Sequence, residues 1–158
     1  MQTGAIALNT VNDPPIRLLA RFEEVFPTKS PQIVVQAPER AMWAAASFNG
    51  TGNYTVCTTG GDVRTTFTYQ SAKRKETVHR RPLPRWVRYI AGVTALIDVP
   101  EMPGIDVVMC GDESGGPRYE YGLGILFAAL WYEINLEEYQ PDQLQEIAER
   151  VRREYVEG

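Results

Sequence analysis

Few side chains in this sequence could carry out nucleophilic, acid–base or metal chemistry. His79 is the only histidine among the 158 residues, so a Ser-His-Asp triad or a two-histidine metal site would depend on it alone. It lies among arginines, in a segment typical of a solvated loop. Cys57 and Cys110 are far from a C-x-x-C spacing, and each falls in a predicted strand. We therefore expect two buried thiols, no nucleophile and no structural zinc site.

Acidic residues near one predicted strand and the loop after it could offer oxygen ligands to a divalent cation. They are Asp106, Asp112, Glu113 and Glu120. A strongly basic segment, residues 73–88, precedes them and contains seven lysines and arginines against Glu76 alone. Only Trp86 and Tyr89 stand at its edge, whereas a nucleic-acid surface usually interleaves aromatic and basic side chains. We expect a solvated loop there and no nucleic-acid partner.

The overall composition is that of an ordinary globular chain, with 44% hydrophobic and 23% charged residues and a formal net charge of −4. No apolar run approaches the roughly 18 residues of a membrane span, and the N-terminus has neither a basic nor an apolar signal region. We expect a cytoplasmic protein without a membrane partner.

Periodicity and turn signals predict the elements that must position these side chains. Residues 1–15 lack periodicity and are expected to form a loose arm, followed by one domain over residues 16–158. In the first half of the chain, the predicted order is a helix at 16–26, a strand at 32–36 and a hairpin with strands at 54–59 and 63–69. A helix at 85–98, a strand at 105–110 and a glycine-rich loop at 113–122 follow. The chain then forms a buried helix at 123–131 and a last helix starting near residue 141. This order is typical of an α/β, or two-layer α+β, domain.

Five segments carry a resemblance to a known family. They are Ala37-Pro38-Glu39-Arg40 and residues 17–26, 86–93, 104–112 and 148–156. Taken in sequence order over residues 16–158, they resemble the N-terminal domain of the galactokinase branch of the GHMP small-molecule kinase superfamily, whose Ala-Pro-Gly-Arg matches residues 37–40. The resemblance implies a mixed sheet with helices packed on one face.

The resemblance also implies a site for ATP with magnesium. Arg40 would stabilise developing phosphate charge, and Asn49 falls in the stretch 45–50 that matches the sugar-binding segment. The loop matching the family's phosphate loop Gly-Leu-Ser-Ser-Ser-Ala spans residues 116–124, and its cradle would use backbone N–H groups at a helix N-terminus. The implied cofactor-binding residues are Gly115, Gly116, Arg118, Gly122 and Gly124.

The chemistry-bearing motifs depart from the family pattern. Two carboxylates and a histidine of the sugar-binding segment are absent, and Glu120 with two tyrosines occupies the places of the serines or their neighbours. The family's catalytic aspartate would follow the helix that ends at Gly158. Because the loop that would hold the bridging nucleotide is altered, we also expect no metal site.

Two functions remain open. One is a catalytically degenerate module that binds a small molecule or assembles with a partner. We expect it to self-associate through the apolar helices at 123–131 and 144–155, as a homo-oligomer. The alternative is an ATP-dependent sugar or small-molecule kinase whose remaining parts come from another chain or a longer gene product.

Overall fold

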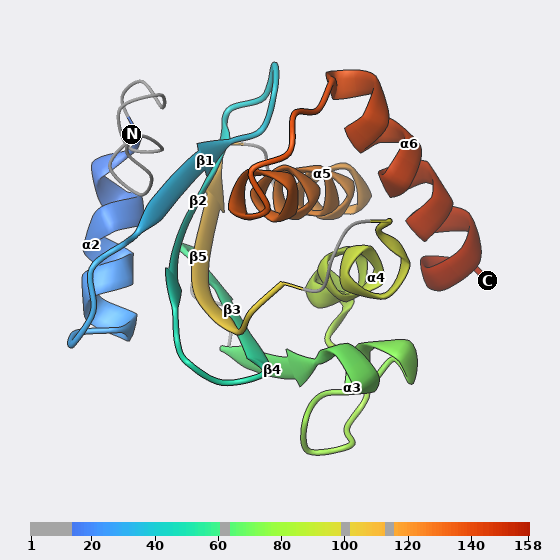
Figure 1. Cartoon of the computed structure of the whole chain (residues 1–158), viewed down its shortest axis with the longest axis horizontal. Coiled ribbons are helices and arrows are strands. Elements are labelled where there is room, and N and C mark those ends of the chain that lie inside the picture. Colours follow the sequence, from blue (N-terminus) through green and yellow to red (C-terminus); the bar gives the residue numbers. More distant parts are fainter. Residues whose placement is uncertain (1–13, 61–63, 99–101, 113–115) are drawn as a thin grey trace.

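A five-stranded mixed sheet forms the centre of the molecule, with strand order β1-β2-β5-β3-β4 (Figure 1). The computed structural model describes residues 14–60, 64–98, 102–112 and 116–158. The strands are β1 (Ile33–Gln36), β2 (Met42–Phe48), β3 (Asn53–Thr58), β4 (Thr65–Thr68) and β5 (Ile105–Gly111). With helices packed on this sheet, the predicted α+β class is confirmed. All but the last two residues of the predicted N-terminal arm, and the tip of the predicted hairpin, lie outside the described residues.

Strand β5 occupies the middle of the sheet although it is the last strand in the sequence. It pairs antiparallel with β2, with Met42 opposite Gly111, and parallel with β3, with Tyr54 opposite Ile105. Six of its seven residues are buried, as expected of a continuous apolar run between two strands. In the sequence, residues 112–116 join its Gly111 end to the longest helix.

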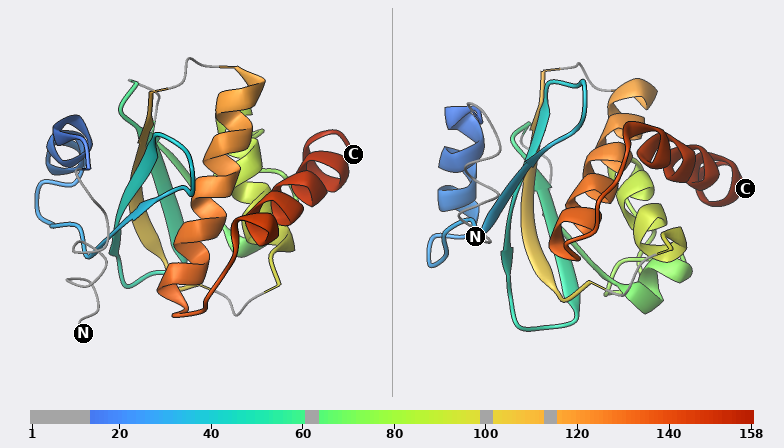
Figure 2. Two further views of the ribbon diagram at one scale, coloured as in Figure 1. Left: turned by 90° about the horizontal axis from the view of Figure 1, so that it is seen from above. Right: turned by 45° about the horizontal axis from the view of Figure 1, so that its top comes forward.

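Most helices lie on one face of the sheet, and one helix lies on the other (Figures 1 and 2). On the first face are α3 (Tyr69–Lys73), α4 (Arg88–Leu96), α5 (Pro117–Ile134) and α6 (Pro141–Val151). A 3-10 turn (Arg85–Val87) leads into α4, and a π-helical turn (Arg152–Val156) continues α6. Helix α2 (Ile16–Val25) covers the opposite face and adds a third layer to the predicted two.

Alternating residues of each strand supply two separate cores. On the α5 side the larger core includes Val35, Ala44, Val107 and Met109, whereas Cys57 and Cys110 pack with α2 on the other side. The predicted burial of both thiols is confirmed.

Two local predictions were wrong or incomplete. Strand β2 was missed because its alanines lack the β-branched residues that mark a strand, yet these small side chains are buried between two layers. Helix α5 begins at Pro117 and not at 123, because proline is favoured at the first helical position and Gly116 forms its N-cap with a φ of 123°. None of the helices in the described ranges is long and apolar enough to cross a membrane.

Candidate functional site

The N-terminal half of α5 lies beside the turn that joins β1 to β2. The Asp112 N–H donates to the Ala41 carbonyl at 3.0 Å, which ties the end of β5 to this turn. A Cβ added to Gly122 would lie 3.0 Å from Arg40 Nη1 and 2.6 Å from Met42 Sδ. Arg40 and one predicted loop glycine are therefore brought together, although they are far apart in the sequence.

The predicted loop glycines have different roles in the structure. Gly116 caps α5, and the Glu120 N–H donates to its carbonyl at 3.0 Å, whereas Gly115 lies outside the described residues. Gly122 and Gly124 are buried inside the helix, where a Cβ on Gly124 would meet Tyr89 Cβ at 3.0 Å. The prediction that these two glycines belong to a loop was wrong, because each allows α5 to pack closely on its neighbours.

Two carboxylates at the start of α5 are paired with arginines of this chain. Arg85 Nε lies 3.2 Å from Glu120 Oε1, and the Glu120 side chain is only 14% exposed. Arg17 of α2 pairs with Asp112. The predicted Arg118 is exposed in the first turn. Much of the positive charge near this helix end is thus offset by acidic side chains.

Tyrosines fill the space around the same helix end. Tyr119 lies against Gly111, where an added Cβ would be 3.4 Å from the ring. Tyr121 meets Tyr89 edge-on at a centroid distance of 5.6 Å. Burial raises the pKa of Tyr121, and the neighbouring Glu149 carboxylate raises it further. The Tyr121 phenol therefore remains neutral near pH 7, and its ring packs as a large, partly apolar group.

An ion-pair network lies at the C-terminal end of α6 and in the turn that continues it. Arg152 lies 2.7 Å from Glu149 and 2.8 Å from Glu157. Its guanidinium holds the pKa of the Glu149 carboxyl below its usual value. Like Arg85 and Arg17, Arg152 already has carboxylate partners within the chain.

Asn49 lies at the other end of the sheet from Arg40. It follows Phe48, which pairs with the first residue of β5, whereas Met42 pairs with the last. The Asn49 amide donates to Asp106 Oδ1 at 3.0 Å, and its Oδ1 accepts from the Thr51 N–H at 2.9 Å. These bonds make Asn49 a structural residue of the β2–β3 loop, so the structure does not bring it together with the other predicted site residues.

The acidic residues considered as cation ligands are dispersed. Asp106 pairs with Lys29, Asp112 with Arg17, and Glu120 with Arg85. Glu113 lies outside the described residues. Across the described ranges, no group of three or more histidine, cysteine or acidic side chains could hold a metal ion.

Residues 74–84 of the basic segment form a loop between α3 and the 3-10 turn, and its lysine and arginine side chains are exposed, as predicted. A bridge between Glu76 and Pro82 and a 2.8 Å bond from the Thr77 N–H to the Arg81 carbonyl give it a defined shape. His79 at its tip is exposed.

The helices expected to self-associate are buried within the chain itself. All residues from Leu123 to Trp131 are buried, because the sheet, α4 and α6 surround α5. The apolar positions of α6, such as Leu144 and Val151, are buried as well. The reasoning that left these faces exposed was therefore wrong.

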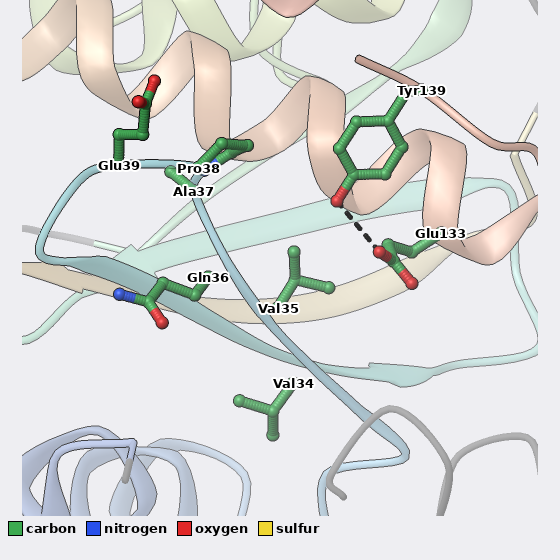
Figure 3. A pocket seen from close by; sticks show the side chains of 8 residues that line it. All are labelled: Val34, Val35, Gln36, Ala37, Pro38, Glu39, Glu133 and Tyr139. Atoms are coloured by element: carbon green, nitrogen blue, oxygen red, sulfur yellow. Dashed lines mark hydrogen bonds between the residues drawn. The ribbon is translucent and has the colours of Figure 1, made fainter. Parts of the chain in front are cut away.

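A groove along α5 was missed by the sequence reasoning. It has a volume of about 320 Å³ and lies between β1 with its following turn on one side and α5 with the segment after it on the other (Figure 3). Its lining residues are Val34, Val35, Gln36, Ala37, Pro38, Glu39, Glu133 and Tyr139. Nothing in the spacing of these residues indicates a common site, because the sheet order alone brings them together.

Comparison with protein-family models and with curated proteins finds no match to this sequence.

Proposed function

We propose that this chain is a galactokinase-like GHMP kinase N-terminal domain that has lost phosphotransfer and serves as a binding module. One observation carries the proposal. The Glu120 carboxylate lies in the first turn of α5, largely buried and paired with Arg85, where the family pattern has the small residues of its phosphate loop.

Two features support the resemblance itself. Glu39 has a φ of 59°, in the left-handed region that favours glycine, and it stands where the family has the glycine of Ala-Pro-Gly-Arg. An inner strand, β5, runs through a glycine-containing loop into the N-terminus of α5. This arrangement is the one that phosphate loops commonly use.

The same helix end is poorly suited to a triphosphate. A helix N-terminus binds phosphate through unpaired N–H groups and the positive end of its dipole. Pro117, at the first helical position, has no N–H to offer a phosphate. The Glu120 carboxylate would also repel phosphate oxygens at close range.

Calorimetric titration with Mg-ATP, alone and with galactose, tests the proposal. We expect no saturable heat from the wild-type chain. Glu120→Ser should be titrated beside it, because removal of the carboxylate restores a small hydroxyl at this position. Heat that saturates at one site per wild-type chain would contradict the proposal.

The alternative is an ATP-dependent small-molecule kinase completed by another chain or a longer gene product. The observation that favours it is Arg40, whose guanidinium lies against the N-terminal half of α5, where a cation could still contact phosphate. Mg-ATP binding that is lost in Arg40→Ala but kept in Arg118→Ala would favour this alternative.

The binding partner of the module could be a small molecule or another polypeptide. If a homo-oligomer forms, it has to use a surface other than the buried faces of α5 and α6. Sedimentation at tens of micromolar measures the oligomeric state directly.

A further inference from the structure

A small hollow lies between the basic segment and the π-helical turn that follows α6. It has a volume of about 150 Å³ and is lined by Lys75, Pro82, Leu83, Arg88, Tyr155 and Val156. Leu83 and Tyr155 are buried and form its apolar floor. Lys75 and Arg88 are exposed, and they are the only charged residues in the lining. The hollow is therefore apolar at its base and positive at its rim.

Lys75 occupies a backbone position that normally takes glycine. Its φ is 59°, and it directly follows Arg74, the C-cap of α3. The Lys75 N–H donates to the Ala72 carbonyl at 2.9 Å. The Glu76 N–H donates to the Ser71 carbonyl at 2.9 Å, and these two bonds form the Schellman pattern of a helix end. Because a residue with a Cβ is less favourable than glycine at such a φ, the backbone does not explain a lysine here.

The Lys75 side chain is held in place on the buried ring of Tyr155. Its Nζ lies 5.3 Å from the ring centroid and donates to the Gly158 carbonyl at 3.3 Å. The Tyr155 hydroxyl in turn donates to the Ala72 carbonyl, which fixes the ring beside α3. An ammonium group has three N–H donors, so two remain for a ligand in the hollow. A cation that is already positioned loses little conformational freedom on binding.

The two cations of the hollow have no carboxylate partner in the part of the chain that the structure describes. Glu76 and Glu157, the acidic residues next to the lining in the sequence, pair with other arginines. A single unpaired surface cation says little, because exposed ion pairs contribute little to stability. Two unpaired cations around one hollow with no acidic residue in its lining instead create a local positive potential.

The geometry points to this hollow as the binding site for the phosphate group of a phosphorylated segment of a partner protein. Charge and size select this ligand. A phosphomonoester carries about −1.5 to −2 charges at pH 7, which matches two cations, whereas each phosphate of a nucleic-acid backbone carries one. The hollow can take a phosphate group, but it is smaller than the roughly 300 Å³ at which pockets for drug-sized ligands begin, so it is too small for a whole nucleotide.

The cations around the hollow favour a polypeptide over a small phosphorylated molecule. Lys73 lies two residues before Lys75, Arg81 lies one residue before Pro82, and both are exposed. A polypeptide can place acidic side chains against them on either side of its phosphate, as in other motifs that clusters of basic residues recognise. Helix α5 does not line the hollow, so this inference does not depend on the proposed function.

Fluorescence anisotropy with labelled peptides tests this inference. The probe is Gly-Asp-Ala-phosphoserine-Ala-Asp-Gly, and two control peptides carry serine or glutamate in place of the phosphoserine. We expect saturable binding of the probe with a Kd below about 0.3 mM. Both controls should bind at least about tenfold more weakly, because they lack the dianion. Inorganic phosphate should displace the probe only at concentrations at least about tenfold above the Kd of the probe, since it lacks the acidic flanks.

Two glycine variants of the full chain locate the contact. Lys75→Gly removes one cation of the hollow and suits the φ at this position. It should weaken probe binding by at least about tenfold and lower the Tm by no more than about 3 °C. Arg80→Gly is the matched control, because Arg80 is exposed in the same loop with a φ of 61° but does not line the hollow. It should change the Kd by less than about threefold.

A variant of the second cation keeps the test independent of the Lys75 backbone. Arg88→Gln should weaken probe binding by about tenfold, since a charged donor is replaced by a neutral one. The inference is overturned by absence of binding at about 3 mM probe, by equal binding of the serine or glutamate peptide or of inorganic phosphate, or by equal effects of Lys75→Gly and Arg80→Gly. A DNA duplex of about 20 base pairs that binds more tightly than the probe, and is weakened equally by both glycine variants, would instead assign the basic segment to nucleic acid.

Discussion

The carboxylates near the two ends of helix α5 differ in whether they form ion pairs within the chain. At the N-terminal end, Glu120 and the neighbouring Asp112 are paired with arginines of the same chain, and tyrosines pack closely around them. At the C-terminal end, Glu133 has a tyrosine hydroxyl but no cation among the described residues. The carboxylates of the first end are neutralised within the chain, whereas the carboxylate of the second end keeps its charge and has only a hydrogen bond.

This difference shows that a glycine-rich sequence need not form a loop. Glycines at the start of α5 suggest a phosphate cradle, yet Gly122 and Gly124 serve helix packing. The C-terminal end has no recognisable motif, yet its Glu133 carboxylate has no cationic partner among the described residues.

The largest loss of stability is expected from truncating a large side chain of α5 in the core. Trp131 is buried in the middle of the core, with its ring 6.1 Å from the rings of Tyr54 and Phe127. Trp131→Ala should lower the free energy of unfolding by about 3–5 kcal/mol. Leu136→Ala, at a position 81% exposed, should change it by less than about 0.5 kcal/mol. Denaturant unfolding followed by near- and far-UV circular dichroism checks both. Separate transitions for the two signals would mean that the ends of α5 are not one cooperative unit.

Alkaline pH should lower the free energy of unfolding more through Tyr139, near the C-terminal end of α5, than through Tyr121, near its N-terminal end. The pKa of Tyr139 is raised in the folded chain, so above about pH 10 the unfolded chain loses a proton that the folded chain keeps. The contribution of Tyr139 to the free energy of unfolding is therefore fully present below about pH 10. It falls by about 1.4 kcal/mol per pH unit as the pH rises toward the folded pKa. Tyr139→Phe should remove this part of the loss, and Tyr121→Phe should remove less. Urea unfolding at several values of pH measures the difference, and equal slopes for wild type and Tyr139→Phe would contradict it.

The smallest changes in stability are expected from variants that compare the Glu120 and Glu133 carboxylates. Arg85→Ala leaves the largely buried Glu120 without its partner and should cost about 1 kcal/mol of stability or less, with a smaller cost at high salt. Glu133→Gln removes a charge that has no cationic partner among the described residues, and the amide oxygen can still accept from the Tyr139 hydroxyl. It should change stability by less than about 0.5 kcal/mol. Thermal or urea unfolding at two salt concentrations compares them. A larger loss from Glu133→Gln than from Arg85→Ala would reverse the distinction between the two ends.

Much of the fold could be predicted from local patterns. The apolar spacing after residue 85 and the proline at 141 predicted α4 and α6, and the apolar run bounded by turn residues predicted β5. Strand β2 could not be predicted this way, because alanine taken alone favours a helix over a strand, and only its burial between two layers explains the strand. The start of α5 was placed too late because glycines inside a helix are normally unfavourable, and only close packing explains them here.

The site was less predictable than the fold. Proximity of Arg40 to Gly122 depends on how β2 pairs with β5, and no spacing along the chain contains that information. The same is true of Glu133 and β1, which meet only because β1 is at the edge of the sheet. Asn49 was expected to bind substrate because of its place in a motif, but its hydrogen bonds hold a loop.

The central position of β5 has a consequence for how the molecule acquires its structure. Strands β2 and β3 are consecutive in the chain but do not pair with each other, and the space between them is filled only when residues 105–111 arrive. Until then both strands present open edges, and their pairing must wait for contacts between distant positions, which slows folding. During synthesis, nascent chains that stop before residue 105 are therefore expected to be the forms most vulnerable to aggregation.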